Sequence, residues 1–163
     1  MVEDVVRRLG YLMLGTRMKR IGERLQADTQ RIIDDFSIPV QAGQWPLLEA
    51  LYRLGPITVG DLAEALGVSQ PGVTRTVAQL GRQGLVEVAS AADDQRRRIV
   101  SLSSKGRKLL ATAQQDIWPL VNEAVADLCE PLDGPLLKQL AALEDGLADR
   151  PLIHRAGKRR TKG

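Results

Sequence analysis

Two short helices separated by a tight turn, between residues 58 and 83, constrain the fold of this chain more than any other feature. Thr58 is a good N-cap for the first helix, and Gly67 suits the left-handed backbone conformation that ends it. Ser69 caps a second helix directly after the turn, and Pro71 falls in its first turn, where proline is tolerated. A capped helix, a glycine turn and a second capped helix form the helix-turn-helix motif.

The second helix of this motif presents one face without bulky apolar side chains. Val73, Val77 and Leu80 are spaced to face the core, and a rotation of about 100° per residue places other residues opposite them. The opposite and flanking positions are Pro71, Gly72, Thr74, Arg75, Ala78, Gln79 and Arg82. Arginine pairs with guanine edges or phosphates, and Gln70 at the amino end can pair with adenine, so this face suits DNA. The alternative is an ordinary surface helix with two exposed arginines.

A β-hairpin with a basic tip is predicted after the second helix. Leu85–Val88 and Ile99–Leu102 are short, β-branched runs, and the stretch between them ends in three consecutive arginines, 96–98. An arginine inserted into a narrow minor groove responds to its width and negative potential. The alternative is a solvated turn. Charge supports a DNA-facing segment, because residues 69–108 hold eight basic and three acidic side chains, although a net charge of +3 for the whole chain proves nothing alone.

Long amphipathic helices are predicted on both sides of the motif and hairpin. Apolar residues at helical spacing predict one long helix over residues 5–36 and a shorter one from Gln44 to Leu54, with Pro46 in its first turn. Another helix is expected after Ser103, and Pro119 should kink or split it. The last helix follows a turn and N-cap at residues 133–135, and its leucines are Leu136, Leu140, Leu143 and Leu147. The tail, residues 150–163, is basic and predicted to be disordered.

Three strings of the sequence resemble the multiple antibiotic resistance regulator (MarR) family, and the order of predicted elements is similar over nearly the whole chain. The strings are Leu-Gly-Val-Ser-Gln-Pro-Gly-Val-Thr-Arg (66–75), Leu-Gly-Arg-Gln-Gly-Leu-Val (80–86) and Asp-Gln-Arg-Arg-Arg-Ile-Val-Ser-Leu-Ser-Ser-Lys-Gly (94–106). The resemblance implies a mainly α fold. A winged helix-turn-helix with a small antiparallel β-wing would occupy residues 37–103, and residues 1–36 and 104–149 would form a helical dimerisation region. Residues 91–93 depart from the family's usual turn, and Pro46 and Pro119 interrupt helices that are often continuous.

The same resemblance implies a dimeric, sequence-specific DNA-binding transcriptional regulator, most often a repressor, on a pseudo-palindromic operator. Recognition helix 69–83 would enter the major groove and wing 89–98 the minor groove. Ser69, Thr74 and Arg75 fall on family positions that contact DNA, and the family's wing arginine and its orienting aspartate fall on Arg96 and Asp94. The complete predicted DNA-binding set is Ser69, Gln70, Pro71, Gly72, Thr74, Arg75, Arg82, Asp94, Arg96, Arg97 and Arg98.

The resemblance also implies a signal that releases the DNA. Many family members respond to a small aromatic acid or phenol bound between the dimer helices and the winged domain. Tyr11, Trp45 and Tyr52 are the predicted lining of such a cleft, the alternative being that they are core aromatics. Some family members sense peroxides through a cysteine near the amino terminus, where this chain has none. Cys129 is expected to be a buried small hydrophobe, the alternative being a peroxide-sensing thiol.

An enzyme is not expected. The chain has one histidine, His154, and one cysteine, Cys129, so no Ser/His/Asp or Cys/His pairing can be proposed, and no metal or cofactor is predicted. No apolar run approaches the roughly 20 residues that span a bilayer, and the amino end lacks a signal-peptide pattern, so a soluble protein is expected. The single cysteine excludes an intrachain disulfide framework and is consistent with a reducing compartment, so a cytoplasmic location is expected. Two other functions remain open: a non-specific architectural DNA-binding protein, and a protein-interaction module, against which Arg75 and Arg96 speak.

Overall fold

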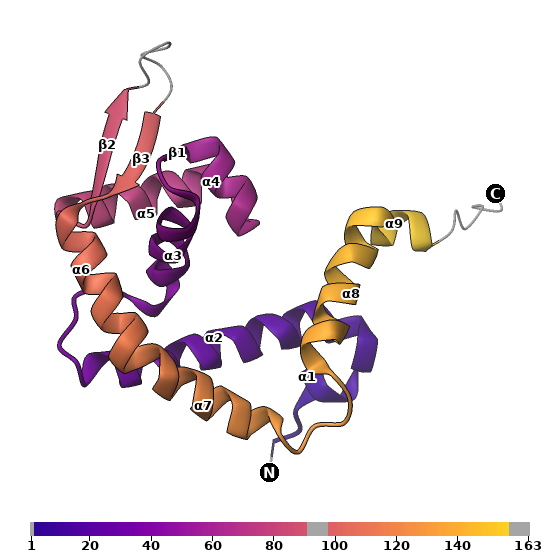
Figure 1. Ribbon diagram of the computed structural model, residues 1–163. Coiled ribbons are helices and arrows are strands. Elements are labelled where there is room, and N and C mark those ends of the chain that lie inside the picture. Colours follow the sequence, from indigo (N-terminus) through magenta and orange to yellow (C-terminus); the bar gives the residue numbers. More distant parts are fainter. Residues whose placement is uncertain (1, 91–97, 157–163) are drawn as a thin grey trace. The chain divides into compact units, whose positions relative to one another are not determined.

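The computed structural model describes residues 2–90 and 98–156 (Figure 1). They fall into two compact units, Met1–Val121 and Asn122–Gly163. In chain order the elements are α1 (Val5–Arg8), η1 (Gly10–Met13), α2 (Leu14–Asp34), η2 (Ala42–Gln44), α3 (Trp45–Leu54), β1 (Ile57–Thr58), α4 (Val59–Leu66), α5 (Gln70–Arg82), β2 (Val86–Ser90), β3 (Arg98–Leu102), α6 (Ser104–Thr112), η3 (Ala113–Ile117), α7 (Trp118–Cys129), α8 (Leu136–Asp149) and α9 (Leu152–Arg155). The predicted fold class, mainly α with a small antiparallel sheet, is confirmed.

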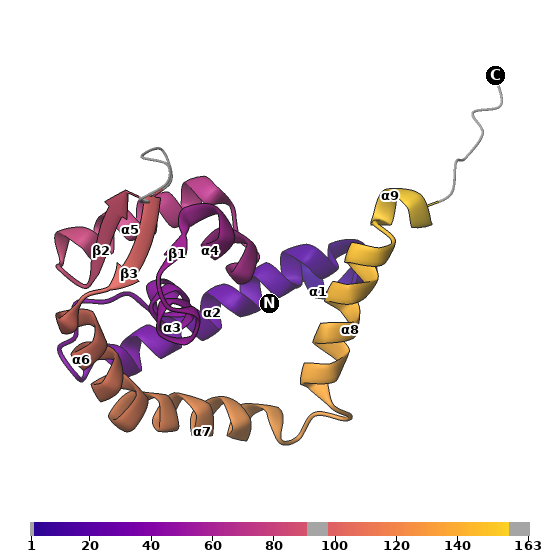
Figure 2. The same cartoon turned by 45° about the horizontal axis from the view of Figure 1, so that its top comes forward.

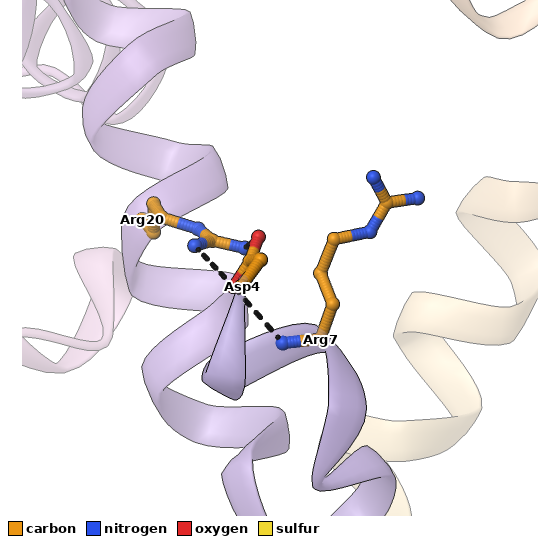
Figure 3. Close-up of polar contacts among 3 residues, drawn as sticks. All are labelled: Asp4, Arg7 and Arg20. Carbon is orange, nitrogen blue, oxygen red and sulfur yellow. Dashed lines mark hydrogen bonds and ion pairs between the residues drawn. The ribbon is translucent and has the colours of Figure 1, made fainter. Parts of the chain in front are cut away.

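The amino-terminal region is not the single long helix predicted over residues 5–36. Gly10 has a φ of +56°, a left-handed conformation that glycine adopts at little cost, and it separates α1 from the 3₁₀ turn η1 and from α2. After this break α1 packs against α2. Asp4 fastens the two helices together (Figure 3), because its carboxylate caps α1 by accepting the Arg7 N–H at 3.1 Å and also accepts both terminal nitrogens of Arg20 at 3.1 and 3.0 Å.

The helix-turn-helix predicted from its capping residues is confirmed. Thr58 Oγ1 accepts the Asp61 N–H at 3.1 Å at the start of α4, and Ser69 Oγ accepts the Gly72 N–H at 3.3 Å at the start of α5. Gly67 ends α4 in the left-handed conformation, with φ +63°. These local hydrogen bonds satisfy helix-end groups that would otherwise lack partners, and they fix where both helices begin and end.

A three-stranded antiparallel sheet, in the order β1-β3-β2, lies beside α3, α4 and α5 (Figure 1 and Figure 2). The predicted hairpin is confirmed: β2 and β3 pair in register from Val86 opposite Leu102 to Ser90 opposite Arg98. Strand β1 was not predicted. It pairs with the other edge of β3, with Ile57 opposite Val100, and so ties the segment before α4 to the wing.

One apolar core joins α3, α4 and α5 to the sheet and to α6. Val73, Val77 and Leu80 are buried in it, as their spacing predicts. The largest fully buried side chains of this core are Ile33, Val40, Leu48, Leu51, Leu62, Val73, Leu80, Leu85, Val100, Leu110 and Ile117. Because Ile33 belongs to the last turn of α2 and Ile117 to the turn before α7, the core anchors one end of each long helix to the winged helix.

The helix after Ser103 is interrupted near Pro119, as predicted, and the interruption is a π-helical turn. The Trp118 N–H donates to the Ala113 carbonyl, five residues back, at the end of that turn. Proline lacks an N–H and its ring collides with the carbonyl four residues earlier, so a wider turn just before it accommodates the ring. The indole N–H of Trp118 donates to Glu49 Oε1 at 2.8 Å, which links this turn to α3.

The carboxy-terminal unit contains α8 and α9. The predicted helix over the leucines of α8 is confirmed, but the N-cap predicted at residues 133–135 provides no side-chain hydrogen bond, since the capping position is Pro135. The prediction of a disordered tail is wrong for residues 152–155, which form α9, and residues 157–163 lie outside the described part. Arg155 holds α9 to the end of α8 by donating to the carbonyls of Arg150 and Gly146. Cys129, predicted to be buried, is half-buried.

None of the helices in the described residues is both long enough and apolar enough to cross a membrane.

Candidate nucleic-acid interface

The exposed face of α5 holds the side chains that the sequence predicted for DNA contact. Ser69, Gln70, Pro71, Thr74, Arg75, Ala78 and Arg82 are all exposed, and Gly72 is half-buried. The Thr74 hydroxyl donates to the Gln70 carbonyl at 3.0 Å. Neither Arg75 nor Arg82 forms an ion pair with a described residue. The face therefore combines two exposed guanidinium groups with small side chains that allow a close approach.

Glutamine side chains outside the predicted DNA-binding set fix the position of α5. Gln44 Nε2 donates to Gln79 Oε1 at 3.0 Å, which joins the turn before α3 to the flank of α5. Gln83 Nε2 donates to the Pro39 carbonyl at 2.8 Å, and the Gln83 carbonyl accepts Lys105 Nζ at 2.8 Å. These contacts connect residues far apart in the chain, so no local pattern in the sequence could reveal them. They hold α5 without using its exposed arginines.

The wing supplies one described member of the predicted set. Arg98 is exposed at the first position of β3 and pairs with Ser90, the last residue of β2. The other three predicted wing residues, Asp94, Arg96 and Arg97, lie outside the described residues. Because α5 packs against β2, strand β2 and the exposed face of α5 belong to one packed substructure.

The three aromatic residues predicted to line an effector cleft do not share one environment. Trp45 is buried at 3% exposure and meets Trp118 edge to face, with ring centroids 4.8 Å apart. Tyr11 and Tyr52 are instead 91% and 54% exposed. Within the single chain, Trp45 is thus a core aromatic, and Tyr11 and Tyr52 are surface residues, because the break at Gly10 and the registry of α3 turn them outward.

A different cavity lies against the helix-turn-helix. Its volume is about 320 Å³, and it opens between the middle of α2, the start of α3 and the α4–α5 turn. The lining residues are Gln26, Gly43, Pro46, Leu47, Leu66, Val68, Gly72, Val73 and Thr76. Most of the lining is apolar, with Gln26 and Thr76 as polar groups, which is the usual character of a small-molecule site. None of the three predicted aromatics belongs to this lining.

Comparison with known proteins gives the same winged helix. Residues 37–97 match the family model described as MarR family. MarR from E. coli, solved as a cysteine-to-serine mutant with operator DNA, is similar at 20% identity, with 90% of this chain and 98% of that chain covered and a TM-score of 0.68. BpsR from Bordetella bronchiseptica, whose DNA binding is regulated by 6-hydroxynicotinic acid, is similar at 23% identity. The match covers 83% of this chain and 93% of that chain, with a TM-score of 0.67. MepR from S. aureus, solved with DNA, is similar at 23% identity, with 82% of this chain and 94% of that chain covered and a TM-score of 0.65.

These likenesses extend the fold match beyond the helix-turn-helix to most of the chain, since each covers at least four fifths of it. The family match itself covers α3, α4, α5 and β2, and it ends directly before β3. The winged helix, residues 37–97, therefore matches the MarR family model, and over most of its length the chain shares the fold of MarR, BpsR and MepR.

Proposed function

We propose that the chain is a transcriptional regulator that binds DNA sequence-specifically through residues 69–83 in the major groove and residues 89–98 in the minor groove. The observation that carries this proposal is the exposed face of α5, where Arg75 and Arg82 have no ion-pair partner among the described residues and Gln44 and Gln83 hold the helix from behind. A rigid helix with free guanidinium groups is what recognition of base edges needs. The complexes of MarR and MepR with DNA support the proposal by analogy.

We further propose that the functional unit is a dimer formed by residues 1–36 and 104–149, with residues 37–103 as the DNA-binding domain. Each end of the chain carries apolar side chains that the single chain leaves exposed: Leu9, Leu12, Met18 and Ile21 near the amino end, and Leu120, Val125, Leu128, Leu137, Leu143 and Leu147 in α7 and α8. Apolar surface of this extent is usually covered by a partner. A two-fold dimer would present two recognition helices about 34 Å apart on a pseudo-palindromic site, most simply as a repressor.

The competing function is a non-specific architectural DNA-binding protein. The two are separated by selecting bound duplexes from random DNA and then titrating an enriched duplex and a shuffled one of equal length over a series of salt concentrations. A sequence-specific regulator binds the enriched duplex more tightly at every salt concentration, and typically by a factor of about 10³ or more. An architectural protein binds both duplexes equally, with the same salt dependence.

For the effector, we propose that a small aromatic acid binds in the cavity of about 320 Å³ beside the α4–α5 turn, where it would alter the position of α5. Regulation of BpsR by 6-hydroxynicotinic acid supports this class of ligand. A panel of aromatic carboxylates, including that compound, should weaken binding to the enriched duplex at fixed salt. Val68→Phe narrows the cavity and should blunt the response. If no acid changes the affinity of the wild-type protein, the effector proposal fails, whereas the DNA-binding proposal stands.

A further inference from the structure

A second cavity, of about 220 Å³, lies at the amino-terminal end of α2 and is lined mainly by arginines. We call it the arginine pocket. Its lining residues are Asp4, Arg7, Arg17, Arg20, Ile21 and Arg24. Figure 3 shows the carboxylate of Asp4 between Arg20 of α2 and Arg7 of α1. All six residues belong to the amino-terminal unit, so the pocket is formed within one compact part of one chain.

The spacing of the arginines and the break at Gly10 together produce the pocket. Arg17, Arg20 and Arg24 lie three and four residues apart on α2, so their side chains project from one face of the helix. The left-handed Gly10 lets α1 fold back against α2, which adds Arg7 and Asp4 to that face. Arg17 and Arg20 are half-buried there. The cluster is therefore a concave site rather than a solvated run of charges along a helix.

Charge in the arginine pocket is strongly unbalanced. Four guanidinium groups line it, and Asp4 is the one carboxylate among the lining residues. Asp4 pairs with Arg20, with Nη1 and Nη2 each 3.0–3.1 Å from a carboxylate oxygen. Within the described part of the chain, Arg7, Arg17 and Arg24 have no ion-pair partner. Like charges this close on a helix repel one another, so the pocket favours additional negative charge.

Asp4 shows which chemistry the pocket accepts. Its two oxygens meet the two terminal nitrogens of Arg20 in parallel, which is the fork geometry that guanidinium offers to carboxylates and phosphates alike. The hydrogen bond from Arg20, followed by that from the Arg7 N–H, lowers the pKa of the Asp4 carboxyl below its ordinary value of 3.8. Asp4 is consequently ionised throughout the neutral range and acts as an anion built into the site.

We propose that the arginine pocket binds a small molecule with two or more carboxylate or phosphate groups, and that Asp4 competes with this anion for Arg20. The volume suits a compact polyanion rather than a polymer. DNA is the weaker candidate, because the pocket and the winged helix lie at opposite ends of α2. The pocket is at the amino-terminal end, whereas the winged helix packs on Ile33 in the last turn. At 1.5 Å per residue, α2 is about 30 Å long. This inference does not rest on the proposed DNA binding and is tested without DNA.

Citrate, pyrophosphate and inorganic phosphate are the probes, titrated by calorimetry into the full-length chain at constant ionic strength, with chloride as the reference anion. We expect citrate or pyrophosphate to bind and to raise the thermal unfolding midpoint. Comparing the affinity for citrate with the affinities for pyrophosphate and phosphate shows whether the site prefers carboxylate or phosphate groups. Arg17→Gln should weaken binding about tenfold, because a charge-assisted hydrogen bond is lost. Arg31→Gln is the matched control, since Arg31 is exposed on the same helix, pairs with Asp28 at 2.8 Å and lies outside the pocket.

The most discriminating variant is Asp4→Asn, because asparagine still caps α1 while the competing negative charge is removed. It should bind the polyanion several-fold more tightly than the wild type, in the opposite direction to Arg17→Gln. The proposal is overturned if no polyanion binds better than chloride, or if Asp4→Asn binds no more tightly than the wild type. It is also overturned if Arg17→Gln changes only the oligomeric state, which would mean that carboxylates of a second copy occupy the pocket.

Discussion

Substituting Gly106 by alanine is expected to destabilise the winged helix by about 3 kcal/mol or more, the upper range for overpacking a closed site. An added Cβ would lie 2.1 Å from the Leu85 carbonyl oxygen and 3.0 Å from its carbon. That oxygen accepts the Ser103 N–H at 3.1 Å, and Ser103 Oγ both accepts the Gly106 N–H and donates to the Gly84 carbonyl. The collision is thus with backbone that is itself held by hydrogen bonds, and no flexible side chain can yield.

Urea unfolding followed by circular dichroism measures this loss as a lower midpoint. Gly81→Ala is the matched control, because Gly81 lies in α5 with open space around its Cβ position. Removing a helical glycine there should raise the stability by roughly 0.5–1 kcal/mol. Wild-type stability of the Gly106→Ala variant would show that α6 does not pack on the start of the wing as described.

Replacing Arg75 with alanine should have the largest effect on recognition. Arg75 is exposed on α5 and free of ion pairs among the described residues, so its guanidinium is available for a base edge. Loss of a bidentate contact should cost roughly 1–3 kcal/mol and relax base preference at one position of each half-site. Fluorescence anisotropy with the enriched duplex and its single-base variants measures both effects.

Arg8→Ala removes the same charge from α1, where Arg8 pairs with Glu3 at 2.8 Å, and serves as the control. It should leave base preference unchanged. Arg96→Ala, in the wing, should weaken binding for all sequences and lower the slope of log affinity against log salt by about 1. Equal base preference in the wild type and in Arg75→Ala would remove this arginine from the proposed site.

Local chemistry explains which parts of the fold the sequence predicts. Thr58, Gly67 and Ser69 each act on helix ends only a few residues away, and these boundaries were predicted correctly. Strand β1 has just two residues, and its identity depends on pairing with Ile99 and Val100, some forty residues later. The break at Gly10 was missed because one glycine does not disturb the apolar periodicity on either side of it.

The candidate sites also contain some features that local spacing predicts and others that depend on tertiary contacts. The burial of Val73, Val77 and Leu80 follows from helical spacing, and this places Arg75 and Arg82 on the exposed face. Trp45 and Tyr52 lie on the same helix, yet Trp45 is buried in the core and Tyr52 is on the surface. The aromatic content of the sequence cannot distinguish these two environments. The arginine pocket was missed for a further reason: three of its arginines share a helix face, but Asp4 and Arg7 join them only because the chain reverses at Gly10.

Selection of bound duplexes from random DNA tests the central claim, sequence-specific recognition by a symmetric winged-helix dimer, most directly. A symmetric dimer should enrich one pseudo-palindromic sequence, with half-sites about 10 base pairs apart from centre to centre. The same selection with Arg75→Ala should enrich a sequence that is degenerate at one position in each half. Recovery of unrelated duplexes, bound with an affinity that depends on salt alone, would contradict it.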